Sequence, residues 1–209
     1  MEVCEGDDDL MKKVEAISVD DRSKSTKVID LLRRFLGIQQ RRAEAYAKLR
    51  SGFSQYMAGG GEIAYQHLCG EITGEFNECS KQVIEMESFL LRPDLCRGDL
   101  AELLKAVQAQ EKQKLQLTVR IQILKKAGRP SERPVSHDSC HFSKPEEHVH
   151  ECMHVHELTE VAGTEDAEAD AEYDSALKEA ICGVQDAVTT INEHLEEVRY
   201  EIEALESEE

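Results

Sequence analysis

The stretch SALKEAICGVQDAVTTINEHLEEVRYEIEAL, residues 175–205, decides the fold of this chain. Its apolar side chains recur at alternating intervals of four and three residues over four heptads. They are Leu177, Ile181, Val184, Val188, Ile191, Leu195, Val198, Ile202 and Leu205. Because an α-helix has about 3.6 residues per turn, this spacing places them along one narrow seam. The stretch predicts a long helix whose seam packs against other helices, either of this chain or of a second copy.

Three further helices are expected ahead of it, from apolar residues at helical spacing. The predicted bounds of the four helices are 24–57, 62–91, 97–127 and 171–206. The glycines of AGGG, residues 58–61, end the first helix, because several glycines destabilise a helix and suit a turn. Pro93 ends the second, and Gly128 caps the third. Short connections favour antiparallel packing of the first three helices.

The sequence therefore predicts an all-α protein, an elongated antiparallel helical bundle or coiled coil of about four long helices. We expect four regions along the chain. They are an acidic disordered N-terminus (1–23), a three-helix part of the bundle (24–128), a disordered His/Cys-rich and acidic insert (129–170) and a C-terminal helix that closes the bundle (171–206).

The insert contains HVHECMHVH, residues 148–156, in which every second side chain is a potential metal ligand. These candidates are His148, His150, Cys152, His154 and His156. Imidazole and thiolate groups bind zinc and nickel, and in an extended chain all five would point to one side. The segment lacks the spaced cysteine pairs of structural zinc sites and the apolar residues that would order it. A specific folded site remains an alternative, but we expect no cofactor beyond weak zinc or nickel binding.

A basic stripe is expected on the first helix. Residues 22–50 carry nine basic and two acidic side chains. Lys27, Arg34, Arg41 and Lys48 are spaced by seven, so they line up along one side of the helix. A phosphate backbone could lie along such a stripe. The simpler alternative is that these side chains flank a bundle seam and face the acidic last helix.

Composition excludes several classes of protein. Charged residues make up 33% of the 209 residues and the net charge is -18, which argues against a protein that coats nucleic acid with its whole surface. No signal-peptide or membrane-spanning pattern is visible. Seven scattered cysteines suggest a reducing, intracellular compartment. The chain has no GxxxxGK[ST] or GxGxxG motif, and its one HExxH match, HECMH at 150–154, lies in the insert expected to be disordered, so we expect no enzymatic activity and no catalytic residue.

Four stretches resemble the Required for excision 1-B domain family. They are LLRRFLGIQQRRAEAYAKLRSGFSQYM (31–57), YQHLCGEITGEFNECSKQVIEME (65–87), DLAELLKAVQAQEKQKLQLTVRIQIL (99–124) and INEHLEEVRYEIEAL (191–205). The resemblance implies a small helical protein of DNA excision repair, located in the nucleus, with no family active site to carry over. It implies protein partners among repair components, and a homodimer through the C-terminal helix stays open. A coiled-coil scaffold or adaptor unrelated to repair, with or without a response to metal, is the alternative.

Overall fold

The computed structural model describes residues 6–133 and 159–207, with side chains described over 22–133 and 166–207. It contains four α-helices and one short 3₁₀ helix, and no strand within these residues. In chain order the elements are α1 (Gly6–Met57), α2 (Glu62–Leu90), α3 (Gly98–Ala127), η1 (Pro130–Glu132) and α4 (Thr159–Ser207). The prediction of an all-α helical bundle is confirmed.

The described chain divides into two compact units. The first unit comprises residues up to Lys114 together with those from Asp186 onward, and it contains α1, α2, the beginning of α3 and the end of α4. The second unit, Leu115–Gln185, contains the rest of α3, η1 and the beginning of α4.

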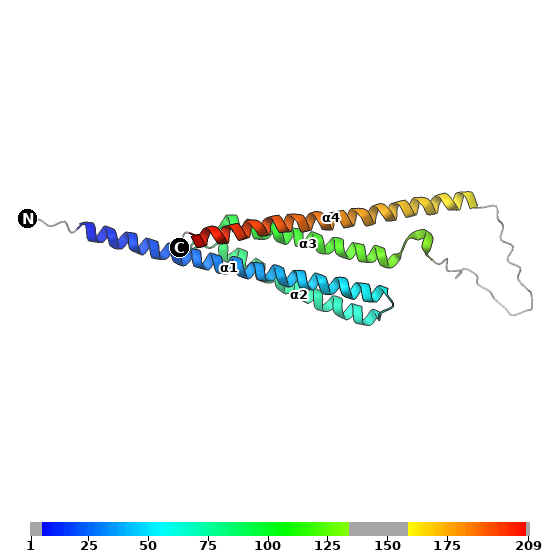
Figure 1. Ribbon diagram of the computed structural model, residues 1–209, viewed down its shortest axis with the longest axis horizontal. Helices are drawn as coiled ribbons and strands as arrows, with labels where there is room; N and C mark the ends of the chain where they lie inside the picture. The colour runs from blue at the N-terminus through cyan, green and yellow to red at the C-terminus, as the bar shows by residue number, and fades with distance from the viewer. Residues whose placement is uncertain (1–5, 134–158, 208–209) are drawn as a thin grey trace, which may run out of the picture. The chain divides into compact units, whose positions relative to one another are not determined.

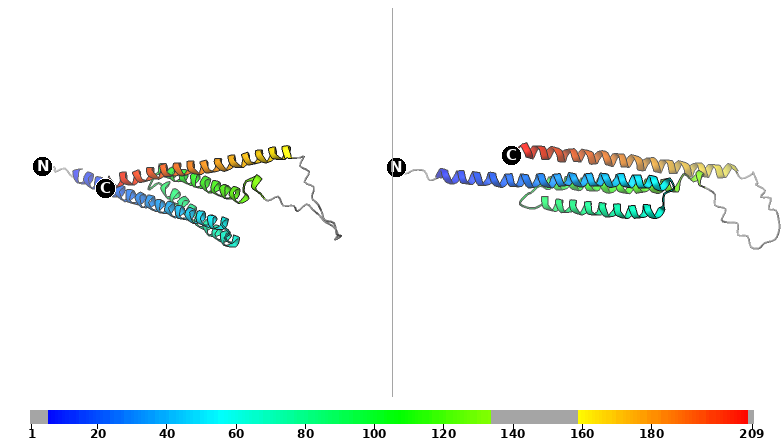
Figure 2. Two further views of the ribbon diagram at one scale, coloured as in Figure 1. Left: turned by 45° about the vertical axis from the view of Figure 1, so that its right-hand side comes forward. Right: turned by 60° about the horizontal axis from the view of Figure 1, so that its bottom comes forward.

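Within the first unit, α1 and α2 lie side by side and antiparallel, joined by a tight turn (Figures 1 and 2). The turn needs glycine at two positions. Gly59 has a φ of 98°, a conformation that L side chains rarely adopt. A Cβ added at Gly60 would lie 2.7 Å from the carbonyl oxygen of Gln55, which is too close.

All four helices contribute to the hydrophobic core of the first unit. Its buried members are Val28, Ile29, Leu32, Phe35 and Ile38 of α1, Cys79, Val83, Met86 and Leu90 of α2, Leu100, Ala101, Leu104 and Val107 of α3, and Ile191, Leu195, Val198 and Ile202 of α4. The α4 members all lie on the predicted seam, and the expected burial of Ile191 and Leu195 is confirmed at 4% and 9% exposure, whereas Ile181 of the same seam is 37% exposed. Packing of these amphipathic faces, rather than helix propensity alone, stabilises the helices.

The second unit is an antiparallel helical hairpin. Leu117 of α3 packs on Gly183 of α4, where an added Cβ would come within 2.7 Å of the Leu117 Cδ1 atom. Further along α3, Arg120 lies 3.7 Å from Glu179, and Arg129, beyond the helix end, pairs with Asp174. Partners later in α3 thus meet positions earlier in α4, as antiparallel helices require.

Two helices begin earlier than the sequence analysis predicted. α1 begins at Gly6 rather than near residue 24, so residues 6–23, expected to be disordered, are helical. α4 begins at Thr159 rather than at 171, within the acidic end of the expected insert. Acidic residues favour the first turn of a helix through its dipole, and Ala and Glu have high helix propensity, so acidity alone did not indicate disorder. The remaining insert, 134–158, lies outside the described residues.

Candidate functional site

The predicted basic stripe lies on α1 of the first unit. Lys27, Arg34 and Lys48 are exposed, and none of them forms an ion pair with another described side chain. Arg41 differs, because it is half-buried against α2. Its Nη2 atom lies 2.8 Å from Oε1 of Glu75, and its Nη1 donates to Oε1 of Gln82 at 3.1 Å. The hydrogen bond to Glu75 raises the pKa of Arg41. Three of the four stripe residues therefore present free charge to solvent.

The alternative interpretation placed these side chains against the acidic last helix. Such a contact exists, but the neighbouring Arg33 makes it, through an ion pair with Glu206 of α4. Arg41 pairs with α2 instead. Seam-flanking ion pairs are thus present in the first unit, alongside the three exposed cations of the stripe.

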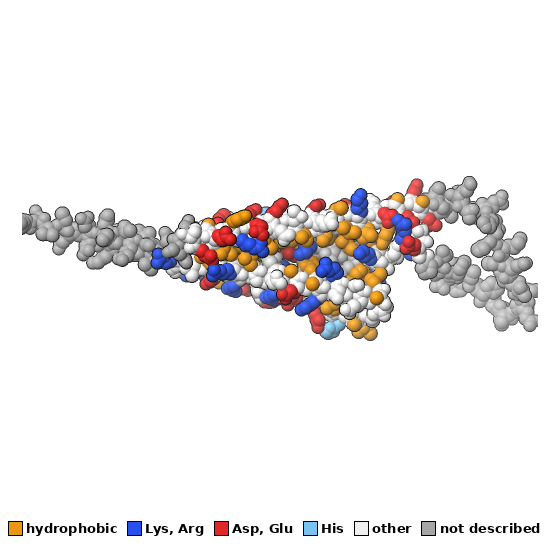
Figure 3. All heavy atoms as spheres, viewed as in Figure 1, with side chains coloured by type: hydrophobic (Ala, Val, Ile, Leu, Met, Phe, Trp, Pro, Cys, Tyr) orange, Lys and Arg blue, Asp and Glu red, His pale blue; other side chains and the backbone are white. Residues whose placement is uncertain are grey.

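Two stripe residues, Lys27 and Arg34, line a surface pocket of about 370 Å³. The pocket is formed by α1, the end of α2 and the connection to α3, and its other lining residues are Asp30, Leu31, Phe89, Arg92, Asp94 and Leu95. The guanidinium carbon of Arg92 lies 4.6 Å from the ring centroid of Phe89, a cation–π arrangement. Three cations and two carboxylates thus surround an apolar floor. Figure 3 shows the same interspersion of basic and acidic side chains over one face.

The connection between α2 and α3 is fixed by backbone hydrogen bonds. The N–H of Cys96 donates to the carbonyl of Arg92 at 2.7 Å, and the N–H of Arg97 donates to the carbonyl of Leu90 at 2.9 Å. Cys96 has a φ of 53°, the only left-handed non-glycine residue among those described. Left-handed conformations are strained for L residues and persist where surrounding contacts over-determine them. The pocket wall that carries Arg92 and Leu95 is therefore stabilised by backbone hydrogen bonds within the connection.

Arg97 anchors the same connection to two helices. Its Nη2 atom lies 2.6 Å from Oδ2 of Asp99, in the first turn of α3, and 2.7 Å from Oε1 of Glu201 in α4. The hydrogen bond from Arg97 lowers the pKa of Asp99. Both partners belong to the first unit, so this pair of contacts ties the loop to its own bundle.

A polar cluster lies inside the first unit. Arg42 is only 2% exposed, and its Nη2 donates to Oγ of Ser80 at 3.2 Å and to Oε1 of Gln108. Gln108 in turn donates to the carbonyl of Ser80 at 3.2 Å. Burial lowers the pKa of Arg42, and the negative charge of Glu111 opposes this shift. The group connects α1, α2 and α3 across their interface.

Tyr46 extends this cluster by one turn. Its hydroxyl donates to the backbone carbonyl of Glu111 at 3.2 Å, and the ammonium of Lys114 lies 3.9 Å from its ring centroid. Lys114 also pairs with Glu111 at 3.3 Å. Burial lowers the pKa of Lys114 and raises that of Tyr46. Several buried polar atoms have no hydrogen-bond partner among the described residues: the side-chain amide of Gln39, Nη1 of Arg42 and Oε2 of Glu111.

From the sequence, Arg42 was counted only as one of the nine basic side chains of residues 22–50, and Glu111 was not identified. A signal was present for both. Arg42 continues the seven-residue spacing of Phe35 and precedes Leu49 by the same interval, and Glu111 follows Leu104 by seven. Both therefore occupy core positions of their helices despite their charge.

The predicted metal ligands His148, His150, Cys152, His154 and His156 all lie outside the described residues, so weak zinc or nickel binding stays a prediction. Over 22–133 and 166–207, no group of three or more His, Cys, Asp or Glu side chains is arranged to hold a metal ion. Cys79 lies in the core, where burial raises the pKa of its thiol. No helix of the described residues is long and apolar enough to cross a membrane.

The fold and the site define a helical bundle with a buried polar cluster and a mixed-charge surface pocket. Residues 30–125 match the model of a family described as DNA repair REX1-B. The matched range covers less than half of the chain and runs through most of α1, all of α2 and nearly all of α3. It supports a relation to a DNA-repair family. The expected resemblance over 191–205 lies outside the matched range. A search of curated proteins found no match, and a search of solved structures found none either.

Proposed function

We propose that this protein is a non-enzymatic accessory factor in DNA excision repair, which acts in the nucleus through protein contacts and through DNA contact by its basic stripe. The observation that carries the proposal is the match of residues 30–125 to the DNA repair REX1-B family. That range contains Arg34, Arg41 and Lys48 and the buried cluster around Arg42, while Lys27 lies just ahead of it.

The geometry of α1 supports the DNA contact. Lys27 and Lys48 are separated by 21 residues of one helix, a span of about 32 Å at roughly 1.5 Å per residue. One turn of B-DNA is about 34 Å long and its backbone winds around the duplex within that length, so a straight stripe can contact the phosphates over part of a turn. Because the net charge of the chain is -18, we expect a modest affinity that falls steeply with salt.

The protein contacts would use the outer face of α2. Ile84 and Leu91 lie seven residues apart, on or just beyond the end of this helix and on one side of it, and are 55% and 62% exposed. Large apolar side chains on a polar surface are typical of protein-binding sites. We therefore propose that a repair partner docks on α2.

The experiment combines a charge-reversal variant with a damage-sensitivity assay. A deletion strain would receive the wild-type protein, the triple variant Lys27→Glu, Arg34→Glu and Lys48→Glu, or a matched control. The control reverses three exposed lysines outside the stripe, Lys81, Lys112 and Lys125. We expect wild type and control to restore resistance to ultraviolet light and to retain DNA binding at low salt, while the stripe variant loses both at unchanged helicity.

Two results separate the parts of the proposal. If the purified protein does not bind DNA even at low salt but still restores resistance, the role is confined to protein contacts. If the deletion strain is not sensitive to damage at all, the proposed role in repair is wrong.

A coiled-coil scaffold unrelated to repair is the second candidate. The second unit favours it through exposed apolar side chains on both of its helices, Val119 and Ile123 on α3 and Ile181 on α4. A homodimer through α4 would cover Ile181. Sedimentation analysis at increasing concentration tests this candidate, and an Ile181→Glu variant should abolish any dimer that forms.

A further inference from the structure

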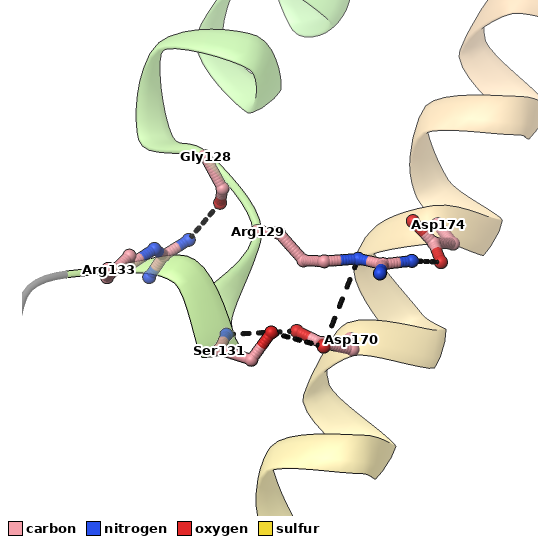
Figure 4. A network of polar contacts seen from close by, with 6 residues as sticks. All are labelled: Gly128, Arg129, Ser131, Arg133, Asp170 and Asp174. Carbon is pink, nitrogen blue, oxygen red and sulfur yellow. Dashed lines mark hydrogen bonds and ion pairs between the residues drawn. The ribbon is translucent and has the colours of Figure 1, made fainter.

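The connection that follows α3 is tied to α4 by a polar network within the second unit (Figure 4). Ser131 donates twice to Asp170, from its backbone N–H at 3.0 Å and from its hydroxyl at 2.6 Å. Arg129 pairs with Asp174, and its Nε atom lies 3.9 Å from Oδ2 of Asp170. Ser131 and Arg129 thus hold the connection after α3 to two carboxylates of α4.

Arg133 completes the local structure on the other side of the turn. Its Nε donates to the carbonyl of Ala127 at 3.0 Å, and its Nη2 donates to the carbonyl of Gly128 at 3.1 Å. A cation at the last carbonyls of a helix is favoured by the helix dipole. Arg129 and Arg133 therefore flank Ser131 at two residues on either side, and η1 bends the chain between them.

We propose that Ser131 is a phosphorylation site, modified by an ATP-dependent protein kinase that selects serine between arginines. The phosphate would separate the connection after α3 from α4. Ser131 is exposed, and the sequence around it is GRPSER, residues 128–133. Its hydroxyl also donates a hydrogen bond of 2.6 Å to Asp170 of α4. The modification would therefore act where the connection after α3 contacts α4.

The chemistry is a phosphoryl transfer. The Ser131 Oγ atom forms a bond to the γ-phosphorus of ATP, the bond between that phosphorus and the bridging oxygen breaks, ADP leaves and the hydroxyl proton is released. Oγ then has no hydrogen to donate to Asp170. A group with a charge of about -1.5 to -2 now stands beside the carboxylates of Asp170 and Asp174.

Repulsion from these carboxylates and attraction to the arginines both favour movement of the phosphate away from α4. A phosphoserine accepts strong, often bidentate hydrogen bonds from guanidinium groups, and Arg129 and Arg133 are in the same turn. Arg129 would leave Asp174 for the phosphate. Exposed ion pairs contribute little stability, so a dianion next to Asp170 is enough to displace them.

The test uses the full-length protein, a purified arginine-directed serine kinase and ATP. We expect intact mass and peptide mapping to show one phosphoryl group at Ser131, absent in Ser131→Ala. Ser175→Ala is the matched control, because Ser175 is an exposed serine of α4, and its phosphorylation should equal that of wild type. Asp170→Asn should be phosphorylated faster, since it weakens the acceptor that holds the hydroxyl.

Hydrogen exchange then measures the consequence. We expect backbone amides of residues 166–177 to exchange roughly 5–30-fold faster after phosphorylation, which corresponds to the loss of one or two kcal/mol of local stability. Amides of residues 83–90 in the first unit should not change. The proposal is overturned if the kinase modifies a GRPSER peptide but not the protein or its Asp170→Asn variant, or if phosphorylated protein exchanges no faster at 166–177.

Discussion

Arg42 of α1 donates a hydrogen bond to Gln108 of α3 from a position that is almost completely buried. A guanidinium group removed from water is destabilising unless its hydrogen bonds and charge are compensated. Ser80 and Gln108 accept hydrogen bonds from Nη2 and Glu111 supplies the opposing charge, while Nη1 has no partner among the described residues. These residues therefore act as one group, and changes to them are expected to be strongly coupled.

Replacement of Arg42 by methionine should destabilise the protein by about 3 kcal/mol, because Glu111 and Gln108 lose a buried partner. The double variant Arg42→Met with Glu111→Met should recover only part of this loss, since the two opposite charges are removed together but Lys114 loses its ion pair with Glu111. Urea unfolding of wild type, both single variants and the double variant measures the coupling. Additive free energies would show that the two charges do not interact.

A glycine at position 96 should stabilise the protein. Cys96 is in a left-handed conformation, which costs a residue with a Cβ roughly 1–2 kcal/mol. Glycine avoids this cost, but it increases the conformational entropy of the unfolded chain, which destabilises the folded protein by roughly 0.5–1 kcal/mol. The expected gain for Cys96→Gly is therefore about 0.5–1 kcal/mol by urea unfolding. Cys96→Ala is the control, because it removes the sulfur and keeps the Cβ. Equal stability of the two variants would mean that the loop relaxes.

The ion pair of Asp99 with Arg97 predicts a dependence of stability on pH. Arg97 lowers the pKa of Asp99 in the folded protein, so in acid the unfolded chain binds the proton first. The contribution of the pair is present above the unfolded pKa of about 3.9 and is lost as the pH falls through the lower folded value. Because Asp99 is largely exposed, the effect is small.

Thermal unfolding of wild type and Asp99→Asn at several pH values tests this. The wild-type protein should have the higher midpoint at pH 7, and the two midpoints should converge below about pH 4. If the difference between the two midpoints persists at low pH, it does not arise from the charge of Asp99 but from the change of side chain in the first turn of α3.

Leu195 is buried in the core of the first unit, so its replacement should be costly for stability. Leu195→Ala is expected to destabilise by roughly 2–5 kcal/mol, and Leu195→Asp by more, because it buries an unpaired charge. Ala204→Asp, on an exposed position of the same helix, should change stability by less than about 0.7 kcal/mol. Circular dichroism during heating measures all three. Similar midpoints for the two aspartate variants would contradict a packed seam.

A variant with residues 134–158 replaced by a Gly/Ser linker should keep its helix content and thermal midpoint. It should restore damage resistance to a deletion strain and lose weak nickel binding. Wild type should release nickel below about pH 6, when the imidazoles become protonated. Restoration of resistance only when His150 and Cys152 are present would instead establish a functional metal site.

The helical seams were predictable from sequence because apolar side chains repeat at the interval that one helix face requires. Ile191, Val198 and Ile202 are buried as the spacing predicted. Arg42 was not predicted to be buried, because its burial depends on acceptors contributed by two other helices. The pocket was not predictable either, since its wall depends on the strained backbone at Cys96. Lys27 and Arg34 were identified from spacing alone, but their neighbours Phe89 and Arg92 come from another helix and a loop.

The cluster around Arg42 also determines how the helices of the first unit are aligned along their length. An apolar repeat of seven residues permits a helix to slide by one heptad and still bury apolar side chains. A slide of α3 by seven residues would take Gln108 away from Arg42 and Ser80, and of the two present acceptors it would leave the guanidinium only the Ser80 hydroxyl of α2. The other alignments are therefore disfavoured, so one polar cluster selects a single register from several that the seams alone would allow.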